Sequence, residues 1–163
     1  MWLWSIIGLG WSLENRVETE PPHPAFRIGV QALTVSSLGL TAGASFAADN
    51  GWYLGAQYGL SRVRGNRLFG VNTDLFYDGS MNNVMWTVGP KVGVLALGLD
   101  AGLAVQAMGE VQSGYYARSS LNLGLGSLYY RMIGWSDLGM MHQVGFSVQI
   151  PQLIGRNPSQ KEF

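Results

Sequence analysis

Apolar residues recur at every second position over most of this 163-residue chain. Successive side chains of an extended strand point to opposite faces, so a period of two predicts strands with one apolar face. The alternation is clear where Trp52, Leu54 and Ala56 are separated by Tyr53 and Gly55. Strands are predicted in this way over residues 26–32, 38–46, 52–61, 69–77, 84–96, 99–106, 115–123, 128–132 and 140–150, with a further first strand over 2–12.

The segments between these strands alternate in kind. Longer connections are predicted at 13–24, 48–50, 79–82, 109–113 and 135–138, and tighter ones near 36–37, 64–66, 97–98 and 125–127. The stretch 13–24 is acidic and rich in proline, so it cannot pair in a sheet and is predicted to be a loop. Pro90 lies inside a predicted strand and removes a hydrogen-bond donor, so a β-bulge is expected there.

This order of elements predicts an all-β fold, an antiparallel up-and-down transmembrane β-barrel of about ten strands. A barrel of eight strands is the alternative. An even strand count with long loops at one end and short turns at the other is typical of barrels that span membranes. The barrel is expected to cover residues 1–150, followed by a polar and basic tail over 151–163.

The second face of the strands is rich in glycine and poor in charge. Only 12% of the residues are charged, against about 25% in typical soluble domains. This face therefore resembles the lining of an enclosed interior, while the apolar face suits contact with lipid. The polar residues predicted to line the interior are Arg27, Gln57, Asp74, Lys91, Asp100, Gln106, Arg118 and Arg131.

A water-soluble barrel of the lipocalin kind is the alternative, and it has the opposite polarity. It would place Leu54, Val94 and Leu103 in a packed centre. Its outer face would carry polar residues such as Gln57 and Arg118.

Charge also divides the two ends of the predicted barrel. Acidic residues, Asp49 and Asp78 among them, fall in or beside the longer connections. Arg62, Arg64 and Arg67 cluster at one of the tight turns. This pattern predicts an acidic outer rim and a basic inner turn.

The last predicted strand carries a recognisable pattern. Residues 143–150 read polar-x-Gly-x-x-apolar-x-apolar, which resembles the C-terminal β-signal of bacterial outer-membrane β-barrel proteins. The matching residues are Gln143, Gly145, Val148 and Ile150. The resemblance implies a place in the bacterial outer membrane, with membrane lipid and the barrel-assembly machinery as partners.

A protein of that compartment is expected to carry a secretory leader. The segment 27–47 has the order of one, with a basic residue, an apolar run and then Ala44, Ser45, Phe46 and Ala47. The other possibility is a leader removed before Met1.

Little in the sequence points to catalysis. His142 is one of only two histidines, and the residue two positions later is Val144, whereas outer-membrane lipid A deacylases place His and Ser on adjacent same-face positions. We therefore assign no catalytic residue. The chain has no cysteine, no zinc-ligand spacing and no phosphate-binding loop, so neither a metal site nor a cofactor is expected. Its net charge of +0 and the lack of a basic-aromatic patch make a nucleic-acid partner unexpected.

The function expected from these patterns is non-enzymatic. The chain would be a small pore for solutes or ions, or a structural or accessory barrel of the outer membrane. An outer-membrane lipid-modifying or proteolytic enzyme is the first alternative, and a soluble ligand-binding barrel is the second.

Overall fold

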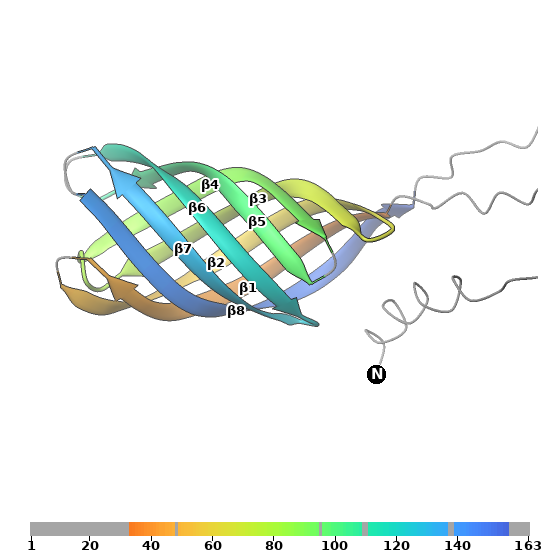
Figure 1. Cartoon of the computed structure of the whole chain (residues 1–163), viewed down its shortest axis with the longest axis horizontal. Coiled ribbons are helices and arrows are strands. Elements are labelled where there is room, and N and C mark those ends of the chain that lie inside the picture. The colour runs from red at the N-terminus through yellow and green to blue at the C-terminus, as the bar shows by residue number, and fades with distance from the viewer. Residues whose placement is uncertain (1–32, 48, 95, 109–110, 137–138, 157–163) are drawn as a thin grey trace, which may run out of the picture.

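The computed structural model describes residues 33–47, 49–94, 96–108, 111–136 and 139–156, which form eight β-strands joined in chain order (Figure 1). The strands are β1 (Leu33–Phe46), β2 (Asn50–Arg64), β3 (Arg67–Asp78), β4 (Asn83–Val94), β5 (Leu97–Gln106), β6 (Gln112–Leu123), β7 (Gly126–Trp135) and β8 (Gly139–Arg156). Among the described residues, no helix is long and apolar enough to cross a membrane.

The strands form one closed antiparallel barrel, in which each pairs with its sequence neighbours and β8 pairs back onto β1. The pairing is staggered: following paired residues once around the barrel from Thr34 leads to Ala44, further along β1. A stagger of this kind requires the strands to tilt against the barrel axis. Figure 1 shows this tilt from the side.

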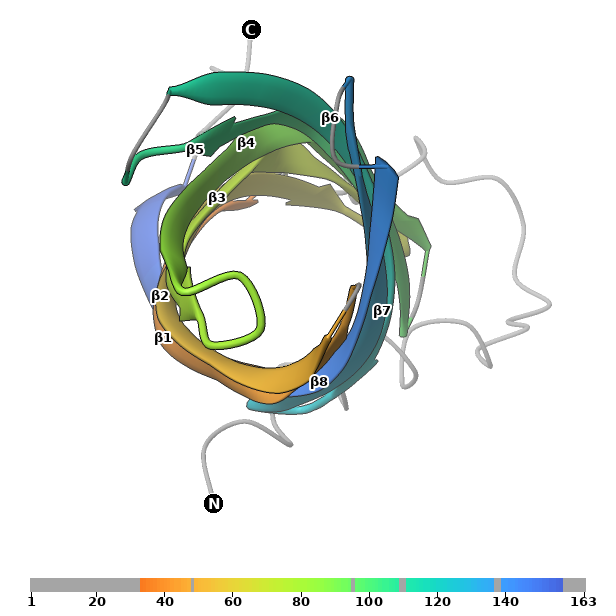
Figure 2. The same ribbon diagram turned by 90° about the vertical axis from the view of Figure 1, so that its left-hand side faces the viewer.

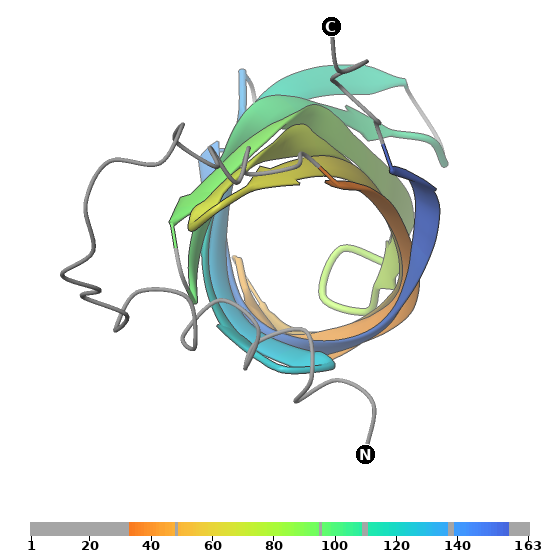
Figure 3. The same ribbon diagram turned by 90° about the vertical axis from the view of Figure 1, so that its right-hand side faces the viewer.

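The two ends of the barrel differ. One end, which we call the loop end, carries the connections 47–49, 79–82, 107–111 and 136–138. The opposite end, which we call the turn end, carries the two-residue connections 65–66, 95–96 and 124–125. The start of β1 and the end of β8 lie there too. Figure 2 looks onto the loop end and Figure 3 onto the turn end.

The eight-strand alternative is therefore the right one, and the count of about ten is wrong. Ser36 and Ser37 do not form a turn, because β1 continues through them and stays paired with both β2 and β8. They are not followed by the glycine or asparagine that tight turns favour. The predicted strands 2–12 and 26–32 and the loop 13–24 lie outside the described residues.

Pro90 does not produce the predicted bulge. Pairing between β4 and β5 stops at Gly89 and Pro90 and resumes at Lys91 in the same register. On its other side, Pro90 stays paired with Val71 of β3. The missing N–H donor of Pro90 therefore leaves only a short gap in the pairing between β4 and β5.

Strand β8 is longer than predicted. It continues past Ile150 through Pro151 to Arg156 and pairs with the start of β1. A register shift between Thr34 and Val35 accommodates this extension. Residues 33–46, within the segment that resembles a leader, form β1 of the barrel.

Candidate functional site

The barrel places its apolar side chains outside and its polar side chains inside, which is the reverse of a water-soluble barrel. Leu54, Val94 and Leu103 are 55%, 56% and 64% exposed on the outer face. Gln57 and Arg118 are only 2% and 4% exposed, because their strand positions turn them into the barrel. The interior therefore holds the candidate functional groups.

Four charged side chains meet in the middle of this interior, and we call them the ionic cluster: Asp74, Asp100, Arg118 and Arg131. Arg118 donates to Asp100 from Nε at 3.0 Å and from Nη2 at 2.5 Å. Asp74 Oδ2 accepts from Arg118 Nη1 at 2.8 Å and from Arg131 Nη1 at 3.0 Å. Asp74 thus joins strands β6 and β7 to β3, which is not a neighbour of either in the sheet.

Amide side chains extend the ionic cluster. Gln143 accepts from Arg131 Nε at 2.7 Å and donates to Asp78 at 2.6 Å. Asn72 donates to Asp74 at 3.2 Å. When the Gln57 amide is oriented so that both its oxygen and its nitrogen have hydrogen-bond partners, its oxygen accepts a hydrogen bond from Arg118 Nη2 at 2.9 Å. Buried charges are tolerated when they are paired and hydrogen-bonded in this manner.

Aromatic rings surround the two arginines. The guanidinium carbon of Arg131 lies 3.9 Å from the centre of the Phe76 ring, and that of Arg118 lies 5.3 Å from the centre of the Tyr129 ring. Tyr53 donates a hydrogen bond to the Tyr129 hydroxyl at 2.8 Å, which in turn bonds Thr41 of β1. Cation–π contacts of this type stabilise a desolvated guanidinium.

The loop half of the interior contains an apolar core. Its core contains Tyr53, Phe76, Met85, Ala104, Tyr116, Tyr129, Ile133, Trp135 and Met141. Figure 2 shows the loop between β3 and β4 folded over the mouth of the barrel, and Met81 of this loop packs against the core. Asp78 holds the loop in place by accepting hydrogen bonds from the backbone N–H groups of Ser80 and Met81, at 2.9 and 3.3 Å.

The turn half is lined by smaller groups. Its inward positions include Ser37, Gly39, Gly59, Ser61, Gly70, Gly93, Gly98, Ser120 and Ser127. Lys91 lies beside this region, 8% exposed, and makes no ion pair with another described residue.

The structure places the predicted interior residues as follows. Gln57, Asp74, Lys91, Asp100, Arg118 and Arg131 are all buried inside the barrel. Gln106 is half-buried at an inward position, and its Oε1 has no hydrogen-bond partner among the described residues. Arg27 lies outside the described residues.

Asp78 belongs to the interior, although its sequence context predicts an acidic outer rim. It is fully buried at the end of β3. The described interior therefore carries equal numbers of carboxylates (Asp74, Asp78, Asp100) and cationic groups (Lys91, Arg118, Arg131). The predicted interior residues, by contrast, comprise four cationic groups and only two carboxylates, because Asp78 is missing from them.

The residues of the assembly pattern divide between the two faces. Val148 and Ile150 are 50% and 66% exposed on the outer face. Gln143 is buried in the interior and bonded to Arg131. Gly145 leaves room for the Tyr53 hydroxyl, which a Cβ atom at this position would meet.

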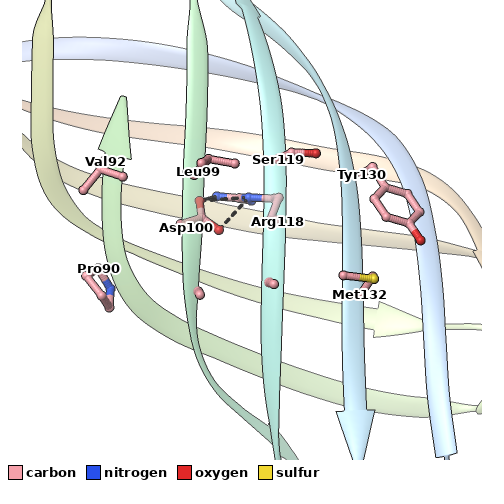
Figure 4. A pocket seen from close by; sticks show the side chains of 10 residues that line it. Pro90, Val92, Leu99, Asp100, Arg118, Ser119, Tyr130 and Met132 are labelled. Carbon is pink, nitrogen blue, oxygen red and sulfur yellow. Dashed lines mark hydrogen bonds and ion pairs between the residues drawn. The ribbon is translucent and has the colours of Figure 1, made fainter. Parts of the chain in front are cut away.

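The outer face has a shallow apolar groove of about 480 Å³ across β4 to β7 (Figure 4). Its lining includes Pro90, Val92, Leu99, Ala101, Ala117, Ser119, Tyr130 and Met132. Tyr130 is hydrogen-bonded to His142 Nδ1 at 2.6 Å and stacks on its ring. His142 is thus paired with a tyrosine, and no acid or serine is bonded to it among the described residues.

No group of three or more His, Cys, Asp or Glu within the described part of the chain is arranged to hold a metal ion. No protein-family model, curated protein or solved structure matches the chain.

Proposed function

We propose that this protein spans the bacterial outer membrane as a closed barrel and serves there as a structural or anchoring element, not as a pore. The observation that carries the proposal is the inverted polarity: Leu40 and Leu103 are 67% and 64% exposed, whereas Asp74 and Arg131 are fully buried. Full burial of an exposed leucine is worth roughly 1.5–3 kcal/mol, so each of these partly exposed leucines would gain part of that on leaving water for an apolar surrounding. A ring of such side chains around the whole barrel suits hydrocarbon.

The positions of the aromatic side chains support the same proposal. Trp52 is the third residue of β2 and Trp86 the fourth of β4, counted from the loop end, and Tyr77 lies one residue before the loop-end terminus of β3. Phe46 is the last residue of β1 and Tyr115 the fourth of β6, both counted at the loop end. Membrane barrels carry such belts of aromatic residues where hydrocarbon meets the polar head groups.

Bonds that cross the barrel support a closed lumen. Asp74 of β3 is bonded to Arg118 of β6 and Arg131 of β7. Near the loop end, Asp78 of β3 is bonded to Gln143 of β8. The apolar core packs beside these bonds, with Phe76 against Arg131, and the 79–82 loop folds over the loop-end mouth. A solute would have to break several charge-assisted hydrogen bonds to pass, so we do not favour the pore.

The outer membrane is the compartment that fits best, since the assembly pattern at residues 143–150 lies on the strand that closes the barrel against β1. Membrane lipid and the barrel-assembly machinery are the partners that this location requires. We propose no catalytic activity, because the His142 imidazole is engaged by Tyr130 and no nucleophile is bonded to it among the described residues.

The membrane part of the proposal is tested by refolding. Protein refolded into phospholipid vesicles is expected to resist added protease and to change its gel mobility on boiling, as closed barrels do. A chain that stays soluble and monomeric without detergent and does not insert would contradict the proposal.

The closed lumen is tested in planar bilayers. The folded parent protein is expected to give no steady current. Replacing Asp74, Arg118 and Arg131 together by serine removes the bonds that Asp74 makes across the barrel and is expected to produce measurable conductance. Asp49→Asn, which changes an exposed acid at the loop end, is the matched control and should stay silent. Steady current from the parent would contradict the structural role and favour the small pore.

A further inference from the structure

The exposed charge of the described side chains lies at two places. Among residues whose side chains are described, the exposed charged groups are Asp49 at the loop end and Arg62, Arg64 and Arg67 at the turn end. All other described charges of the barrel wall lie inside. Three arginines in one place on a wall otherwise almost free of exposed charge need a physical reason.

The register brings these arginines together. Arg64 and Arg67 face each other across the two-residue turn between β2 and β3, and Arg62 is paired with Phe69. Arg62 and Arg64 lie two residues apart on the same outward face of β2. Like charges directly opposite in a sheet are destabilising. None of the three makes an ion pair with another described residue. A bound anion would remove this repulsion.

We infer that Arg62, Arg64 and Arg67 form a binding site for the phosphate of an anionic phospholipid at the turn-end edge of the barrel. Guanidinium groups recognise phosphate through paired, charge-assisted hydrogen bonds. The inference rests on the proposed membrane location, which puts these side chains at the level of the head groups.

The neighbouring surface selects a lipid over a free anion. Toward the loop end, the outward faces of β2 and β3 continue directly from the arginines into Leu60 and Phe69, which are 42% and 55% exposed. A molecule with a phosphate and an acyl chain can contact both parts at once. Inorganic phosphate would use only the arginines.

The test measures lipid selection by the folded full-length chain. Parent and variants are first shown to insert into zwitterionic vesicles, so a failure to insert counts against the membrane location alone. They are then placed in bilayers that contain phosphatidylglycerol and phosphatidylcholine, and the lipids retained on the protein are counted by native mass spectrometry. Arg62→Gln, Arg64→Gln and Arg67→Gln should each lower phosphatidylglycerol enrichment about fivefold at low ionic strength.

Two further variants make the result specific. Replacing the three arginines by lysine keeps the charge but removes the paired hydrogen bonds, so it should retain more enrichment than the glutamine triple variant. Asp49→Asn changes charge at the opposite end and should leave enrichment unchanged. Equal enrichment in parent and glutamine triple variant would overturn the inference.

Other occupants would also be recognised. Equally tight binding of inorganic phosphate, measured in zwitterionic vesicles at constant ionic strength, would overturn the assignment to a lipid. The assignment to a lipid would also be overturned if enrichment appeared only after Glu14, Glu18 and Glu20 were replaced by glutamine. In that case the partner of the arginines in the parent protein would be the acidic stretch of the same chain.

Discussion

Tyr53 reaches over two glycines that face each other across β1 and β8, Gly43 and Gly145. A Cβ atom on either glycine would meet the Tyr53 hydroxyl. The same hydroxyl donates to Tyr129 at 2.8 Å and so links the wall to the aromatic groups around Arg131. Gly145, the glycine of the assembly pattern, therefore has a packing role within the barrel. This role is separate from any recognition by the barrel-assembly machinery.

Replacing Gly145 by alanine should lower the free energy of unfolding of the refolded protein by about 1–3 kcal/mol, the usual range for overpacking. Adding Tyr53→Phe removes the nearest atom and should recover part of this loss. Urea unfolding in detergent micelles measures both. Gly126→Ala is the control, since a Cβ atom there meets only carbonyl oxygens, the nearest at 3.7 Å. If Gly145→Ala is as stable as Gly126→Ala, the glycine matters only for recognition.

Single residues also mark where sequence reasoning succeeds and where it fails. Asp74 and Arg118 were predictable as interior groups because they share the parity of the glycine-rich face. Asp78 was not, because an aspartate before Gly79 and Ser80 is a turn signal. It does cap the 79–82 turn, yet its other oxygen faces inward and accepts from Gln143. One carboxylate performs both tasks, and local sequence reveals only the first.

At the scale of the strands, the two-residue period predicts β2 to β7 well because each has one polar and one apolar face. Two of the short turns follow from glycine: Gly65 and Gly124 open their turns with φ of 57° and 71°. The extension of β8 was not predictable, because Pro151 indicates an end to pairing when the sequence is read alone. Its partner there is the distant start of β1, at Ser37.

The glycine-dependent turn between β2 and β3 gives a test at this scale. Gly65→Ala should lower the free energy of unfolding by about 1 kcal/mol, because a Cβ atom disfavours positive φ. Asn66→Ala, in the same turn, should change it by less than about 0.5 kcal/mol, since Asn66 is not among the described residues with positive φ. Thermal or urea unfolding of both variants measures the difference. Equal losses would mean that the turn is held by its flanking strands and not by the glycine.

For the whole molecule, the decisive information is which residues meet across the barrel. Parity alone places Asp74, Arg118 and Arg131 inside, but their contact depends on the stagger that closes β8 onto β1. The stagger in turn depends on the strand count, which local patterns overestimated. The interior was therefore predictable as a list of residues, whereas the ionic cluster required the structure.

The polarity of the whole barrel can be tested with its own tryptophans. Trp52 and Trp86 are 58% and 44% exposed on the outer face near the loop end, whereas Trp135 is 5% exposed in the interior. In single-tryptophan variants refolded into vesicles, with phenylalanine at the other positions, brominated lipid should quench Trp52 and Trp86 but leave Trp135 nearly unaffected. Bromine near the head groups should quench Trp52 more than bromine at the bilayer centre, because Trp52 is the third residue of β2 at the loop end. Quenching of Trp135 equal to that of Trp52 would mean that lipid reaches the interior, and no quenching of either would place the barrel outside the bilayer.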